Sequence, residues 1–193
     1  MITQLATLKA RLSIDEFEVK YDTMLTNSIR ALSAQFDKQT GRTLARTLGI
    51  KQEFNAVETE LCLTCIPLEV VTMFELKSNE TDDWSEQPGV EYLVRAGCVL
   101  SLAAPLGGWR QQARVTYTGG HALPGTTVGA GQTPLPDDLE QAAVEQAAYW
   151  FRNRDTLGLV RHPPFQGTYD QFAQLDLLLS VRTVLDGYRR LVT

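Results

Sequence analysis

The chain has 193 residues, of which 44% are hydrophobic and 21% are charged, and its formal net charge is −5. These values are ordinary for a soluble globular protein, and they argue against a protein that reads DNA sequence, because such proteins carry clustered lysine and arginine. No apolar run approaches the ~20 residues of a membrane helix, and the N-terminus lacks the apolar stretch of a signal peptide. We therefore expect synthesis in the cytoplasm and no membrane partner.

The first third of the chain predicts helices. Leucines three and four positions apart share one helix face within Thr3–Leu12. Ser13, with a glutamate three residues later, matches a capping box, which predicts a second helix from about Asp15 to Thr40 that Gly41 ends. The apolar side chains of this second helix predict a buried stripe, which comprises Phe17, Tyr21, Met24, Ile29, Leu32 and Phe36.

From about Gln52 the pattern changes to the alternation that is typical of strands. Four runs predict strands: Glu58–Ile66, Val70–Leu76, Val90–Arg95 and Ala113–Thr118. Short turns between them favour an antiparallel sheet. Residues 50–118 are also acidic, with five basic and ten acidic residues. The following loop, rich in Gly, Thr and Pro, has no buriable pattern, which predicts that it is mobile or ordered by a partner.

Helical periodicity then returns. Pro136 suits the start of a helix, and three acidic residues that follow it complement the positive end of the helix dipole. The side chains on one face of this helix are Leu139, Ala143, Ala147 and Trp150, and the alanines allow a neighbouring helix to approach closely. A last helix is predicted over about Thr168–Leu191.

The predicted fold class is therefore α+β, a small helical bundle of two N-terminal and two C-terminal helices with an antiparallel β insert. We expect a single domain over residues 1–193. Its predicted parts are a helical segment (1–50), the β insert (51–118), a flexible loop (119–135) and a second helical segment (136–193).

Cys62 and Cys65 form a Cys-x-x-Cys pair, which invites a zinc or redox interpretation. Both chemistries need the two sulfur atoms to converge, whereas side chains three apart on a strand point to opposite faces. The chain has three cysteines and no second such pair. The pattern favours buried cysteines, and we predict no metal site and no cofactor.

His121 follows a glycine pair and is the candidate general base of an alternative, enzymatic function. No nucleophile motif accompanies it, and the glycines near it match neither a P-loop nor a dinucleotide fingerprint. We therefore predict no catalytic residue. Arg152 and Arg154 end the third predicted helix, where they either complement the helix dipole or form an interface.

Five short motifs, taken together and in order, resemble the head–tail connector (adaptor) proteins of long-tailed bacteriophages and prophages. They are Gln39–Arg42 (Gln-Thr-Gly-Arg), Tyr117–Gly120 (Tyr-Thr-Gly-Gly), Leu135–Leu139 (Leu-Pro-Asp-Asp-Leu), Phe151–Arg154 (aromatic-Arg-x-Arg) and Leu185–Arg189 (Leu-x-x-Tyr-Arg). The likeness spans most of the chain.

This resemblance implies a structural, non-enzymatic protein of the virion, located at the head–tail junction. It implies a homo-oligomeric ring, with twelve copies expected, that docks on the portal protein and offers a platform to a tail-side neck or tail-completion protein. Genomic DNA would pass through without specific binding, which the net acidity favours. The alternative is another neck or tail-completion protein. Candidate interface residues are Trp150, Arg152, Arg154, Tyr188, Arg189, Gly119, Gly120 and His121.

Overall fold

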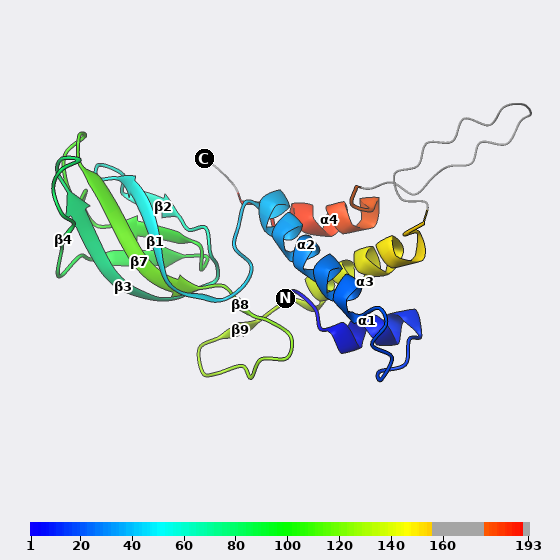
Figure 1. Ribbon diagram of the computed structural model, residues 1–193. Coiled ribbons are helices and arrows are strands. Elements are labelled where there is room, and N and C mark those ends of the chain that lie inside the picture. Colours follow the sequence, from blue (N-terminus) through cyan, green and yellow to red (C-terminus); the bar gives the residue numbers. More distant parts are fainter. Residues whose placement is uncertain (156–175, 191–193) are drawn as a thin grey trace, which may run out of the picture. The chain divides into compact units, whose positions relative to one another are not determined.

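The computed structural model describes residues 1–155 and 176–190 (Figure 1). The chain divides into two compact units. The helical unit comprises Met1–Thr40 and the described part of Leu135–Arg189, and the β unit comprises Gly41–Pro134 together with Arg190. In the part of the chain that is described, no helix is both long and apolar enough to cross a membrane.

The helical unit contains α1 (Leu5–Leu12), α2 (Asp22–Thr40), α3 (Asp137–Arg152) and α4 (Leu179–Gly187). Helix α3 contacts each of the other three (Figure 1). Its alanines Ala143 and Ala147 are fully buried, so small side chains let these neighbours approach. Gln146 is also fully buried, and its Oε1 accepts a 2.7 Å hydrogen bond from the backbone N–H of Leu178. This bond fixes the start of α4 against α3.

The second helix begins at Asp22 rather than at the predicted Asp15. Ser13 does not cap it; Ser13 ends α1 instead, in a left-handed conformation with φ of 57°. The stripe prediction holds for Ile29, Leu32 and Phe36, which are fully buried. It fails for Phe17, which lies in the loop between α1 and α2 with 89% of its surface exposed. The predicted last helix falls partly outside the described residues.

The β unit contains nine strands in three sheets. A four-stranded sheet has the order β1-β7-β3-β4, a three-stranded sheet has the order β2-β6-β5, and a short parallel pair joins β8 to β9. The strand bounds are β1 Thr47–Asn55, β2 Glu60–Cys62, β3 Leu68–Lys77, β4 Ser85–Glu86, β5 Tyr92–Arg95, β6 Val99–Leu102, β7 Gln112–Gly119, β8 His121–Ala122 and β9 Thr133–Pro134.

The two larger sheets enclose one hydrophobic core. Strand β7 contributes Ala113, Val115 and Tyr117, all fully buried and spaced two apart, as expected for one face of a strand. Leu61 and Leu100 approach from the three-stranded sheet. In the four-stranded sheet, Glu75 of β3 and Arg114 of β7 form an ion pair whose shortest contact is 2.8 Å.

The predicted fold class is wrong in its central claim. The β part is not a small insert in a helical bundle, because its strands pair into two antiparallel sheets that bury a core of their own. Strand β1 crosses the predicted boundary between the helical segment 1–50 and the β insert 51–118, and it pairs with β7 about sixty residues later; Ile50 lies opposite Tyr117. Such long-range pairing turns an insert into a self-contained unit.

Individual strands were easier to anticipate than their pairing. The runs Val70–Leu76 and Ala113–Thr118 lie within β3 and β7, and the other two predicted strands contain β2 and β5. The sequence does not predict β1 and β6, which lack a sustained polar–apolar alternation, nor the two-residue strands β4, β8 and β9, which are too short to show one. The predicted loop after Gly119 begins and ends in the β8–β9 pair.

Candidate interaction sites

An arginine–aromatic cluster, defined as Tyr21, Phe151 and Arg154, lies at the C-terminal end of α3. The rings of Tyr21 and Phe151 meet edge to face with centroids 5.2 Å apart. The Arg154 guanidinium lies 4.7 Å from the Phe151 centroid and 5.7 Å from the Tyr21 centroid. Arg154 is exposed, and stacked arginine beside aromatic rings is a composition that protein interfaces favour. The structure thus brings one predicted interface residue, Arg154, into such a cluster.

The two other predicted residues at this end differ in their environments. Arg152 is exposed in the last turn of α3. Trp150 is half-buried, and its indole Nε1–H is shielded from solvent with no acceptor among the described residues. Buried donors in folded proteins normally have an acceptor. The described residues supply none for the indole N–H of Trp150.

A buried lysine shapes the loop between α1 and α2. Lys9 is 4% exposed, and its Nζ donates to the carbonyl oxygens of Glu16 at 3.0 Å and Glu18 at 2.8 Å. The same Nζ lies 2.6 Å from Asp22 Oδ1 at the start of α2. The Lys9 ammonium group therefore holds the loop in place through these three contacts. The loop leaves Phe17 and Val19 in solvent, with 89% and 75% of their surfaces exposed.

Tyr188 and Arg189 lie at the end of α4. The Tyr188 hydroxyl donates to the Asp138 carboxylate, 2.8 Å from Oδ1 and 3.0 Å from Oδ2, which joins the end of α4 to the start of α3. Burial, with a smaller effect of this hydrogen bond, raises the pKa of Tyr188 to about 12. Arg189 is exposed and lies 3.5 Å from Asp186. Tyr188 thus has a structural role within the helical unit.

Gly119 and Gly120 are buried at the end of β7. A Cβ atom on Gly119 would lie 2.6 Å from the carbonyl oxygen of Cys65, and one on Gly120 would lie 2.6 Å from that of Ala45. Gly120 also has a φ of +98°, which side chains rarely adopt. Close backbone packing therefore favours glycine at both positions, and both glycines are buried within the β unit.

His121 follows these glycines at the base of the loop. Its Nδ1 lies 3.0 Å from the carbonyl oxygen of Pro134, and its backbone pairs in the β8–β9 ladder. Burial lowers the pKa of the imidazole, which therefore favours its neutral form. Its ring is half-buried and engaged with backbone. This geometry gives no support to the alternative of a general base.

Cys62, Cys65 and Cys98 form no disulfide bond with one another. Cys65 is fully buried, with its Sγ 3.5 Å from the carbonyl oxygen of Ala45, whereas Cys62 on β2 is half-buried. Among residues 1–155 and 176–190, no group of three potential metal ligands converges.

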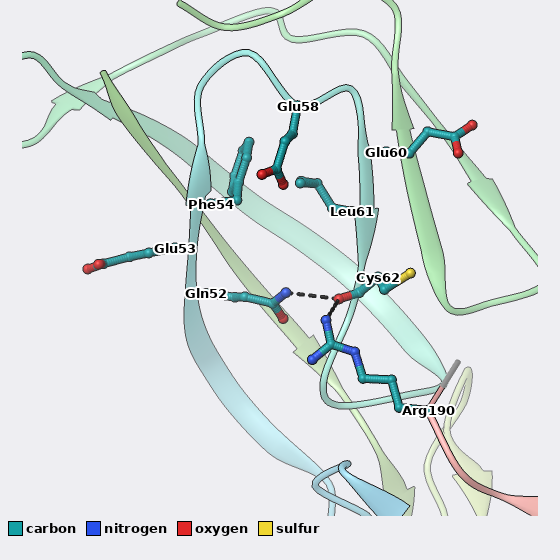
Figure 2. Close-up of a pocket in the computed structure, with 8 residues that line it drawn as sticks. All are labelled: Gln52, Glu53, Phe54, Glu58, Glu60, Leu61, Cys62 and Arg190. Carbon is teal, nitrogen blue, oxygen red and sulfur yellow. Dashed lines mark hydrogen bonds between the residues drawn. The ribbon is translucent and has the colours of Figure 1, made fainter. Parts of the chain in front are cut away.

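A pocket of about 280 Å³ lies between β1 and β2 (Figure 2). On the pocket side, neither strand pairs with another strand of the described residues. Gln52 and Arg190 approach the same carbonyl oxygen of Cys62, with hydrogen bonds of 2.9 Å and 2.7 Å. Three glutamates, Glu53, Glu58 and Glu60, line the rest of the pocket, together with Phe54, Leu61 and Cys62. Side chains therefore replace the missing backbone ladder between β1 and β2.

A second pocket, of about 310 Å³, lies between β3 and the segment Glu86–Tyr92 that leads into β5. We call it the β3–β5 groove. Its apolar lining includes Val71, Phe74, Val90 and Tyr92, and the rings of Phe74 and Tyr92 lie 5.7 Å apart. Beside it, β5 is exposed at every residue. Leu93 and Val94 expose 70% and 45% of their surfaces.

The sequence interpretation missed the Lys9-centred loop, and it predicted strand β5 without predicting that this strand lies exposed at the edge of a sheet. A signal for the first does exist, because Lys9 is four residues after Leu5 and so falls next to the apolar face of α1. No comparable signal exists for β5, since an alternating Tyr-Leu-Val-Arg run gives no indication of which strands flank it.

No protein-family model matches the sequence, and no curated protein matches it significantly. Several solved structures resemble the fold. A chain in the neck of an empty gene transfer agent particle, computed with C6 symmetry, has a TM-score of 0.59 at 17% identity and covers 97% of this chain and 89% of its own. A chain in the virion of the native particle has a TM-score of 0.58 at 18% identity, with the same coverage.

The third structure, the neck of the native particle computed with C12 symmetry, gives a TM-score of 0.54 at 17% identity and covers 98% of this chain and 89% of its own. These neighbours are chains of gene transfer agent particles, two of them in the particle neck. Nearly the full length of the chain therefore has the fold of chains found in gene transfer agent particles and their necks.

Proposed function

We propose that this protein is a ring-forming head–tail connector in the neck of a phage-like particle, docked on the portal and joining capsid to tail. The observation that carries the proposal is the fold likeness over 97% of the chain to a protein in the neck of a gene transfer agent particle. Two of the neck structures were computed with C6 and C12 symmetry, which supports a ring of identical subunits with twelve copies expected.

A closed ring requires two different surfaces on each subunit, because head-to-tail contacts are heterologous. The helical unit offers one such surface in the exposed Phe17 and Val19, which the buried Lys9 holds in place. Ordering an exposed apolar loop before assembly reduces the entropy lost when it binds. The arginine–aromatic cluster adds Arg154, a residue type common at the centres of interfaces.

The charge of the chain supports a passive DNA channel. A protein that neutralises phosphates with lysine and arginine holds DNA in proportion to the number of such contacts. This chain has 18 basic and 23 acidic residues. Genomic DNA would therefore pass through the ring without specific binding, and no step of the function is enzymatic.

The partners follow from the place of a connector between head and tail: a portal protein on the capsid side, and a neck or tail-completion protein on the tail side. The runner-up is a neck component that contacts only tail-side proteins. Both predict rings, and they differ in portal binding.

Electron microscopy of the purified chain, alone and mixed with the portal of the same particle, tests the proposal. Rings that co-purify with the portal are the expected result. Rings that ignore the portal and bind a tail-side protein would favour the runner-up. A chain that stays monomeric with every neck component would contradict both.

A further inference from the structure

We propose that residues Thr126–Val128 of one subunit add as a strand to the open edge of β5 in the neighbouring subunit. The inference rests on the proposed ring and identifies one contact that would close it. The contact would join an exposed strand edge, which is the acceptor, to an exposed segment that can adopt an extended conformation, which is the donor.

The acceptor is the edge of β5. In the three-stranded sheet, β5 pairs with β6 on one side and has no strand on the other within the described residues. Ala103 N–H donates to the carbonyl of Glu91, so by the alternation of antiparallel ladders the backbone groups of Tyr92 and Val94 point outward. Open edges with apolar side chains promote association, and soluble proteins normally protect them with charge, proline or short length.

The side chains at this edge are suited to a partner strand. Val94 and Leu93 are exposed on opposite faces of β5, since successive residues alternate. Next to Tyr92 lies the β3–β5 groove of about 310 Å³, which can take an aliphatic side chain from an added strand. The outward edge therefore offers both backbone hydrogen-bonding groups and an apolar recess, the two elements of recognition by strand addition.

The donor is the loop between β8 and β9. It contains three consecutive β-branched residues, Thr126, Thr127 and Val128, all exposed. The backbone N–H and C=O groups of Thr127 and Val128 make no hydrogen bond to any described residue. β-Branched residues favour extended backbone. Gly125 and Gly131 flank the segment at φ of +84° and +79°, so the chain can turn away on both sides of it.

The uncharged loop is chemically suited to the apolar edge of β5, and we therefore choose it as the segment that binds there. Residues 122–134 contain no charged side chain, so no ion has to be desolvated when the segment covers the apolar edge. Alternation places Val128 and Thr126 on one face, where Val128 can enter the groove, and Thr127 on the other face beside Leu93. The loop and the edge are different surfaces of the β unit, as a head-to-tail ring contact requires.

Cross-linking of mixed subunits tests the proposal. Full-length Thr127→Cys and Leu93→Cys proteins are mixed under conditions that give rings by electron microscopy, treated with a short bismaleimide and analysed by peptide mass spectrometry. An adduct joining positions 127 and 93 is expected, and it can only arise between subunits. The matched control replaces Leu93→Cys with Leu48→Cys, a leucine of the same unit with 67% exposure against 70% for Leu93, and should give no such adduct.

A second measurement uses assembly itself. Leu93→Lys places a charge at the edge and should reduce ring formation about tenfold at fixed protein concentration, whereas Leu48→Lys should assemble as the parent does. Circular dichroism checks that both variants keep their melting temperatures. Rings that form without the adduct and tolerate Leu93→Lys would overturn this contact while leaving the proposed function standing. Absence of rings under all conditions would overturn both.

Discussion

The Gln52 side chain joins β1 to β2 by accepting a 3.0 Å hydrogen bond from the backbone N–H of Thr64 through its Oε1. Its Nε2 donates to the carbonyl of Cys62 at 2.9 Å, and Oε1 also accepts from the Tyr117 hydroxyl at 3.2 Å. One amide therefore supplies the hydrogen bonds that a strand ladder would otherwise make between these two strands.

Replacing this amide should weaken the β unit. Gln52→Leu removes the acceptor of the Thr64 N–H, whereas the Tyr117 hydroxyl keeps Thr64 Oγ1 within 3.1 Å. A buried unsatisfied group costs about 1–3 kcal/mol, so we expect a loss of roughly 2 kcal/mol in the free energy of unfolding, measured by urea denaturation. Gln112→Leu, at an exposed glutamine of β7, should change it by less than about 0.5 kcal/mol. Equal effects of the two changes would contradict this role of Gln52.

Gly119→Ala and Gly120→Ala should each destabilise the β unit by roughly 2 kcal/mol or more, since the new Cβ would meet a backbone carbonyl oxygen at 2.6 Å and Gly120 also has positive φ. Gly187→Ala is the control, because nothing lies within 4 Å of the added atom. Thermal unfolding of the three variants checks this. Unchanged melting of Gly119→Ala would contradict the requirement for glycine at that position.

Lys9→Met should loosen the loop that carries Phe17. Methionine fills a similar volume but leaves the carbonyl groups of Glu16 and Glu18 without their donor and Asp22 without its cation, so we expect a loss of roughly 2 kcal/mol in stability. Lys38→Met, at an exposed lysine of α2, is the control. Hydrogen exchange should show faster exchange in residues 14–21 of the Lys9 variant alone. Unaltered exchange there would mean that Lys9 does not organise the loop.

The Tyr188–Asp138 contact predicts a pH dependence in the alkaline range. Burial and the hydrogen bond raise the pKa of Tyr188 in the folded protein to about 12, from an ordinary value of 10.0. Folding thus favours the neutral phenol, and this stability is complete below pH 10 and lost as the pH rises through 12. The free energy of unfolding of the parent and of Tyr188→Phe, measured between pH 10 and pH 12, isolates the contribution of Tyr188. Equal dependence of the two free energies on pH would contradict this contribution.

The loop at residues 123–132 should exchange its amide hydrogens rapidly in the free subunit and more slowly in assembled rings. Residues 125–131 are exposed, and ordering them costs about 1–2 kcal/mol per residue, which a partner must offset. Deleting Gly125–Gly131 should leave the melting temperature nearly unchanged while impairing head–tail joining. Strong protection in the free subunit would contradict the prediction.

Local patterns in the sequence were sufficient for the elements whose signal lies within a few residues. Helix α3 was predicted from acidic residues after Pro136 and the spacing of Leu139 and Ala143, and β7 from its alternation. The position of Arg154 at a helix end was also visible. Its stacking on Tyr21 was not, because that ring comes from a loop more than a hundred residues earlier.

The sequence by itself determined the hydrophobic periodicity of each segment, the net acidity of the chain and the absence of any recognisable catalytic motif. Only the tertiary structure decided that β1 pairs with β7 and that β5 lies at the open edge of its sheet. It also decided that residues 14–21, predicted as part of the second helix, form a loop whose carbonyl groups bind Lys9. The reason is physical: periodicity depends on neighbours along one segment, whereas pairing, burial of a cation and the exposure of an edge depend on surfaces that meet only when distant segments pack together.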